Sequence, residues 1–218
     1  MTDLFREVDE EVKRDKVALF LKKHNTLLIS LLLAIVAGTG GYRAYTYFEQ
    51  KKAAEAGAKY ESVLAAANEA KANEVKAGLE SLLKDGPSGY QVLARFRLAA
   101  ETAKTDARAA AQAFDVLSND SAIDADLKAL AKVRAATLLI DTLGYDEIRA
   151  RLEGESASGR PWRLMARESL GIAAYKAGKI DEAEKHFEAV LSDPEATQTA
   201  RQRAEMMMAL GRSGTAGK

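Results

Sequence analysis

The longest apolar stretch of the chain runs from Asn25 to Tyr42 and contains eighteen residues without a charged side chain. Lys23 and His24 precede it, and Arg43 follows it. As a helix it would be about 27 Å long at about 1.5 Å per residue. That length is close to the roughly 30 Å thickness of the hydrocarbon core of a bilayer. The pattern therefore predicts one transmembrane helix over residues 25–42.

A cleaved secretory signal is the main alternative for this stretch. Small residues near its end would suit a cleavage site; they are Ala37, Gly38, Gly40 and Gly41. A secretory signal has a short basic leader, whereas this leader is 24 residues long and carries six acidic and six basic side chains. Glycine is also common inside membrane helices. We therefore expect a permanent anchor.

Basic residues on either side of the anchor predict its orientation. The twenty residues before it carry six lysines and arginines, and the twenty after it carry four. Because basic residues favour the cytoplasmic side, we expect residues 1–24 in the cytoplasm and residues 43–218 in the periplasm of a Gram-negative cell. The leader is expected to be an amphipathic tail that lies on the membrane or docks on a cytoplasmic partner. Its apolar face consists of Phe5, Val8, Val12 and Leu19.

Beyond the anchor, the clearest pattern is a pair of helices between Pro161 and Pro194. Proline suits the first turn of a helix and Gly178 is a good left-handed terminator, so the first helix is expected over residues 162–177. The second helix follows a tight turn and ends before Pro194. Small residues would let the two helices approach closely, and an aromatic ring would fill the remaining space. The expected packing positions are Leu170, Gly171, Ala183 and Phe187.

The spacing of these residues resembles a tetratricopeptide repeat, whose pattern is Leu-Gly, then Ala-x3-Phe, then Pro within about 34 residues. Arg167 stands where the family often has an aromatic residue, and Ala174 stands where tyrosine is usual. Val190 replaces a small residue, and Pro194 comes one residue early. An unrelated helical hairpin is the alternative interpretation of this unit.

The same spacing recurs in weaker form earlier in the chain. Candidate second helices carry Leu79 and Leu83, Ala110 and Phe114, and Ile148 and Leu152. Their partner helices, together with that of the best unit, are expected over residues 44–70, 88–104, 124–142 and 162–177, and a closing helix over 195–210. The predicted fold is therefore all-α, an α-solenoid of four tetratricopeptide-like pairs with a C-terminal capping helix. It would occupy residues 43–212 and be followed by a flexible tail over residues 213–218.

Composition agrees with this fold and gives no signal for disulfides, nucleic-acid binding or metal binding. Alanine is abundant and alternation of β-branched residues is nearly absent, as in helical proteins. Cysteine is absent and 32 basic residues balance 32 acidic ones, so neither disulfides nor nucleic-acid binding is expected. The two histidines, His24 and His186, lack metal-ligating residues at suitable spacing. We expect no enzyme activity, metal, cofactor or small-molecule substrate.

In tetratricopeptide repeats the first helix of each pair lines a groove that binds proteins. Carried onto the best unit, this resemblance gives five candidate groove residues, namely Met165, Glu168, Ile172, Tyr175 and Lys176. Some members clamp a terminal carboxylate with lysine and asparagine, but Glu168 and Ile172 occupy those positions here. The expected partner is a folded protein or a loosely structured apolar chain. In the anchor, small residues at helical spacing form a candidate helix-contact face of Ala34, Gly38 and Gly41.

Together, the leader EVDEEVKRDKVALFLKKH, the single anchor and the degenerate pairs resemble the YfgM-like family, an ancillary subunit of the SecYEG translocon. The resemblance implies a bitopic inner-membrane protein that associates with the translocon and with a membrane-anchored periplasmic prolyl-isomerase chaperone. It further implies a role as an adaptor or chaperone that assists newly exported proteins. The alternative is a scaffold for envelope assembly or cell division that uses the same groove.

Overall fold

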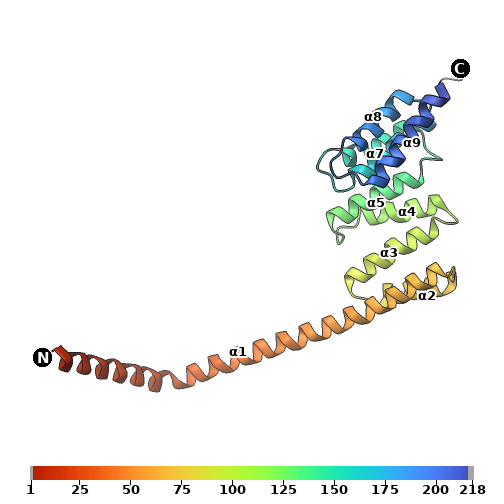
Figure 1. Ribbon diagram of the computed structural model, residues 1–218. Coiled ribbons are helices and arrows are strands. Elements are labelled where there is room, and N and C mark those ends of the chain that lie inside the picture. Colours follow the sequence, from red (N-terminus) through yellow and green to blue (C-terminus); the bar gives the residue numbers. More distant parts are fainter. Residues whose placement is uncertain (1, 216–218) are drawn as a thin grey trace. The chain divides into compact units, whose positions relative to one another are not determined.

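The computed structural model describes residues 2–215, with side chains for residues 14, 16, 18, 19, 21–27 and 29–212. Within this part the chain forms nine α-helices and no strand, so the prediction of an all-α fold is confirmed (Figure 1). The predicted apolar face of the leader lies largely outside the described side chains, and residues 216–218 lie outside the described part. The helices are α1 (Thr2–Asn68), α2 (Ala72–Asp85), α3 (Ser88–Thr102), α4 (Ala107–Ser118), α5 (Ala125–Leu138), α6 (Tyr145–Ser156), α7 (Arg163–Lys176), α8 (Ile180–Leu191) and α9 (Gln198–Thr215).

Two compact units make up the chain, residues 1–55 and residues 56–218. In the described part, one helix, α1, is long and apolar enough to cross a membrane. None of the residues in its most apolar stretch is buried. Residues 25–42 and 44–70 were expected as separate helices, but α1 continues through both as far as Asn68. No proline interrupts α1, and an interior glycine costs a helix only about 1 kcal/mol relative to alanine.

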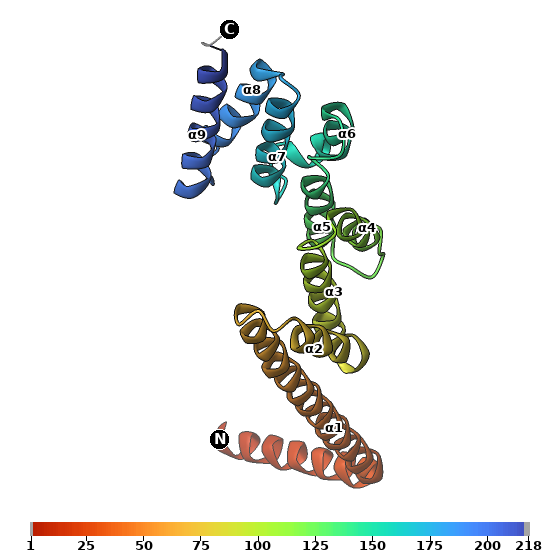
Figure 2. The same cartoon turned by 90° about the vertical axis from the view of Figure 1, so that its right-hand side faces the viewer.

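The second unit is an α-solenoid in which the helices form two layers. Along the chain each helix from α2 to α9 contacts the next, as the stacked ribbons of Figure 1 show. In one layer, α5 contacts α7, and α7 contacts the capping helix α9. In the other layer, Arg151 of α6 donates to Asp115 of α4 at 3.1 Å, and the hydroxyl of Tyr145 in α6 lies 3.2 Å from Nε2 of His186 in α8. Figure 2 shows α4 and α6 on the same side of α3 and α5.

Local signals in the sequence set where these helices begin and end. The side chains of Asp106 and Asp124 accept backbone hydrogen bonds from Ala109 and Asp126, at 2.9 and 2.8 Å, and so cap α4 and α5. Gly178 adopts the left-handed conformation with φ of 72° and ends α7, where we predicted a terminator.

Alanine takes the same role at the end of α1, which no glycine signal marks. Ala70 has φ of 58°, and the N–H of Lys71 donates to the carbonyl of Ala66 at 2.9 Å. This is the same Schellman hydrogen bond that Lys179 makes to Ala174 after Gly178. A left-handed alanine costs about 1 kcal/mol more than glycine, which the packing around this turn must offset.

Close helix packing organises the core of the last pair. A Cβ atom on Gly171 would lie 2.7 Å from two carbon atoms of the Phe187 ring, so only glycine leaves room for the ring. Phe187 is 1% exposed, and Leu170 and Ala183 are buried beside it in the main hydrophobic cluster. A second, smaller cluster joins the end of α1 to α2 and α3, and includes Val63, Leu79 and other apolar residues.

Asp193, just after α8, joins three helices through a buried network of hydrogen bonds. It accepts two hydrogen bonds from Arg163, at 2.7 and 2.8 Å, and one from Arg167 at 2.9 Å. Arg167 also donates to the carbonyls of Ser156 and Ala189, while Arg201 of α9 donates to the Asp193 carbonyl at 2.7 Å. The departure from the family pattern at Arg167 therefore serves to link α6, α7 and α8.

Hydrogen bonds from Arg163 hold the pKa of Asp193 well below its usual range. The unfolded chain titrates this carboxyl near its ordinary pKa of about 3.9. Because the folded-state pKa is lower, the stabilisation is present in full above that value and is lost as the pH falls through the range below it.

Replacing Gly171 by alanine should destabilise the fold by about 1–2 kcal/mol, because overpacking outweighs the gain in helix propensity. The matched control is Gly154→Ala, since a Cβ atom there meets nothing within 4 Å. We expect this control to be neutral or slightly stabilising. Urea unfolding of the full-length variants in mild detergent, followed by circular dichroism, measures both changes. Equal unfolding midpoints for the two variants would contradict the packing described here.

Asp193→Asn should lower stability at neutral pH and should flatten the loss of stability below about pH 4, because the variant has no carboxylate to protonate. Urea unfolding midpoints of the full-length protein between neutral and acidic pH test this expectation. Asp85→Asn serves as a control, since Asp85 is exposed at the end of α2. A variant whose pH profile runs parallel to that of the wild type would show that Asp193 contributes nothing to acid sensitivity.

Candidate functional site

The layer of first helices carries a groove in the second unit. A cavity of about 270 Å³ opens between the end of α1, α3 and α5. Phe114 of α4 forms its floor and packs edge-on against Phe96, with ring centroids 5.8 Å apart. The remaining lining residues are Tyr60, Val92, Leu93, Arg97, Ala100, Leu127, Leu130 and Arg134.

The groove continues along α5 toward α7. A second cavity of about 170 Å³ shares Ala100, Phe114 and Arg134 with the first and adds Leu138 and Met165. The two cavities therefore form one surface that crosses three successive first helices. We call this surface, from Tyr60 to Met165, the groove.

Two arginines provide the charge of the groove. Arg134 is exposed and lines both cavities, and none of the described carboxylates forms an ion pair with it. Arg97 pairs with Glu101 at 2.8 Å, and its Nε atom is buried without a hydrogen-bond partner among the described residues. Neither cavity is lined by an acidic residue. The groove is therefore apolar with a positive centre.

Glu101 is held ionised at the edge of this region. A hydrogen bond from Lys104, and after it the charge of Arg97, lowers the pKa of Glu101 below its ordinary value. The carboxylate lies 2.5 Å from Lys104 and 2.8 Å from Arg97. Because Lys104 shares Glu101, the charge of Arg97 is only partly balanced within the protein.

The five predicted groove residues do not form one open surface. Met165 lines the groove. Glu168 pairs with Arg203 of α9, and the ring of Tyr175 lies next to Gly211 of α9. Ile172 packs against the main hydrophobic cluster, and Lys176 bonds to Asp141. In the last pair, therefore, the capping helix α9 covers part of the face where we expected a ligand.

The open groove lies at the same helix positions in earlier pairs. Ile172 is nine residues after Arg163, the first residue of α7. Arg134 stands nine residues after the start of α5, and Arg97 nine residues after the start of α3. In the same way, Glu168 corresponds to Leu130 and Leu93. Transferred backward from the expected helix starts at 162, 124 and 88, the predicted positions give Leu130 and Arg134 in α5, but Ala94 and Leu98 instead of Leu93 and Arg97 in α3.

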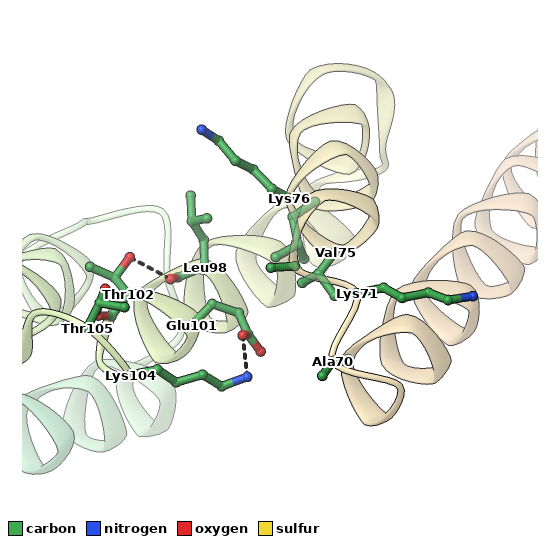
Figure 3. Close-up of a pocket in the computed structure, with 12 residues that line it drawn as sticks. Ala70, Lys71, Val75, Lys76, Leu98, Glu101, Thr102, Lys104 and Thr105 are labelled. Atoms are coloured by element: carbon green, nitrogen blue, oxygen red, sulfur yellow. Dashed lines mark hydrogen bonds and ion pairs between the residues drawn. The ribbon is translucent and has the colours of Figure 1, made fainter.

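A larger pocket of about 480 Å³ lies between the α1–α2 turn, α2 and α3 (Figure 3). Its lysines already have acidic neighbours, since Lys71 pairs with Glu69 at 2.7 Å and Lys104 pairs with Glu101. Figure 3 shows the ammonium groups of Lys71 and Lys76 pointing in different directions at the rim. This pocket offers an apolar surface without an unbalanced charge, so the groove is the stronger candidate.

None of the remaining candidate residues lines either cavity of the groove. Among the residues described, no group of histidines and acidic residues could hold a metal ion. His186 is half-buried, burial lowers its pKa, and burial also raises the pKa of its neighbour Tyr145. In the first unit, Gly38 and Gly41 have open space around them, and the side chains around Ala34 are exposed.

Comparison with protein families gives one match, whereas comparisons with curated proteins and with solved structures give none. The match is to the tetratricopeptide repeat-like domain and extends over residues 19–209, which include both the apolar segment and the solenoid. Such repeats typically act as protein-interaction modules that present an extended binding surface. The chain therefore belongs to the tetratricopeptide repeat-like domain family.

Proposed function

We propose that this protein is a membrane-anchored adaptor or chaperone that holds protein segments in its groove beside the inner membrane. Following its resemblance to the YfgM-like family, it would work at the SecYEG translocon, together with a periplasmic membrane-anchored chaperone, on newly exported proteins. The observation that carries the binding role is the apolar groove across α3, α5 and α7, because a protein partner can bury this surface.

Exposed aromatic side chains support the membrane anchor. At the end of the apolar segment and directly after it, four aromatic side chains are 62–69% exposed, namely Tyr42, Tyr45, Tyr47 and Phe48. At about 100° per residue their rings point to different sides of α1. Tyrosine is common at the boundary between lipid and water, and a band of rings around the whole helix suits lipid headgroups better than one protein partner. With Lys22 and Lys23 at the other end, the span would cover residues 25–42.

Photo-crosslinking from the groove tests the adaptor role. A photoreactive amino acid at Leu130 of the full-length protein should crosslink to newly exported polypeptides in cells. The matched control is Val116 of α4, which is 64% exposed but lines neither cavity of the groove. Crosslinks at Leu130 and not at Val116 are the expected result. Equal labelling from both positions, or no polypeptide at Leu130, would refute a groove-based adaptor.

Crosslinking from the anchor tests the placement at the translocon. Probes between Leu31 and Ala37 should label translocon subunits, because a lipid-facing helix of an ancillary subunit must contact them. Replacing Ala34, Gly38 and Gly41 together by leucine should remove these crosslinks and leave insertion intact, since larger side chains prevent close helix contact. Co-purification with cell-division or wall-assembly proteins instead would favour the scaffold alternative.

A further inference from the structure

We infer that the groove selects extended segments in which apolar side chains alternate with acidic ones, and that Arg134 and Arg97 bind the acidic side chains. This inference rests on the proposed adaptor role and specifies its ligand. It depends on a repeated pair of residues that two successive first helices present to the same groove.

Each of the two helices offers one leucine and one arginine, separated by one helical turn. Leu93 and Arg97 lie on α3, and Leu130 and Arg134 lie on α5. All four line the cavity of about 270 Å³ in the groove. Residues four apart on a helix point to the same side. The groove therefore repeats an apolar contact and a cationic contact from one helix to the next.

Neither arginine has its hydrogen-bonding capacity filled by the rest of the described protein. Arg134 forms no ion pair with a described carboxylate, and Arg97 has its buried Nε atom without a partner while its Nη2 reaches Glu101. A guanidinium can donate two parallel hydrogen bonds to one carboxylate. A ligand carboxylate would pair with Arg134 directly, and Arg97 would add a positive charge that is only partly balanced, because its partner Glu101 also pairs with Lys104.

The leucines determine the other half of the ligand. Leu93 is 42% exposed and Leu130 is partly exposed, so each has apolar surface available for burial. Phe96 and Phe114 extend this surface into the floor of the groove. A uniformly acidic segment would leave the apolar surface in water, and a uniformly apolar segment would leave the arginines without partners. An alternating segment satisfies both.

The test compares peptides that differ only in charge. A fluorescein-labelled peptide with alternating leucine and glutamate, amidated at its C-terminus, is titrated with the full-length protein in mild detergent. A matched peptide carries glutamine in place of glutamate. Because charge-assisted hydrogen bonds are stronger than neutral ones, the glutamate peptide should bind about tenfold more tightly. Amidation ensures that side-chain carboxylates and not the chain terminus are recognised.

Charge reversal identifies the residue responsible. Arg134→Glu should abolish the preference for glutamate and should create one for a leucine–lysine peptide. The control Arg108→Glu alters an exposed arginine of α4 that lines neither cavity of the groove, and should keep the wild-type preference. Equal circular dichroism melting curves establish that both variants are folded.

Two results would overturn the inference. One is equal binding of the glutamate and glutamine peptides to the wild type, including no binding of either. The other is a glutamate preference that survives Arg134→Glu. Neither result decides the adaptor role, which depends on crosslinks from Leu130 to exported proteins. Such crosslinks without a charge preference would leave the adaptor standing and remove only its selectivity.

Discussion

Close contact between helices that carry small side chains is the constraint on which the solenoid depends. No helix pair here can bury its apolar face alone, so each must approach the next within the reach of side chains as short as alanine. The buried positions of the first helices are accordingly rich in alanine, for example Ala94, Ala131 and Ala166, each 0% exposed. Where one ring must also fit, as at Phe187, the facing residue is glycine. The core thus fixes helix spacing, and helix spacing fixes the width of the groove.

The same constraint explains why the groove opens in the middle of the solenoid and not at its end. A terminal pair has an apolar side without a following pair, and α9 covers it, with Arg203 bonded to Glu168 and Met208 buried in the core. Covering that side also occupies groove positions of α7. The central helices α3 and α5 have neighbours on both sides, so their exposed face remains available for a partner.

Much of this fold could be predicted from the sequence because its signals are local. Gly178, Asp106 and Asp124 mark helix ends by their own conformation or hydrogen bonds, and helix positions follow from them. The end of α1 could not be read in this way, because Ala70 adopts a conformation that its residue type does not favour. Likewise, the ligand-facing residues depend on what covers each helix, which is a property of packing. The helix-contact face of the anchor remains a prediction from the sequence alone.

Repetition links the fold to its proposed specificity. Because α3 and α5 occupy equivalent places in successive pairs, a residue at one helix position recurs in space at the interval of the repeat. An arginine at that position in both helices therefore forms a row of charges across the groove, whereas a single arginine would form only one contact. Successive side chains of an extended chain point to opposite sides. A chain that crosses α3 and then α5 would therefore turn its acidic side chains toward the arginines and its apolar side chains toward the leucines. Under the proposed function, recognition of alternating apolar and acidic segments would follow from the repeat itself, without a pocket shaped for one sequence, and this would suit the proposed role of holding many different clients.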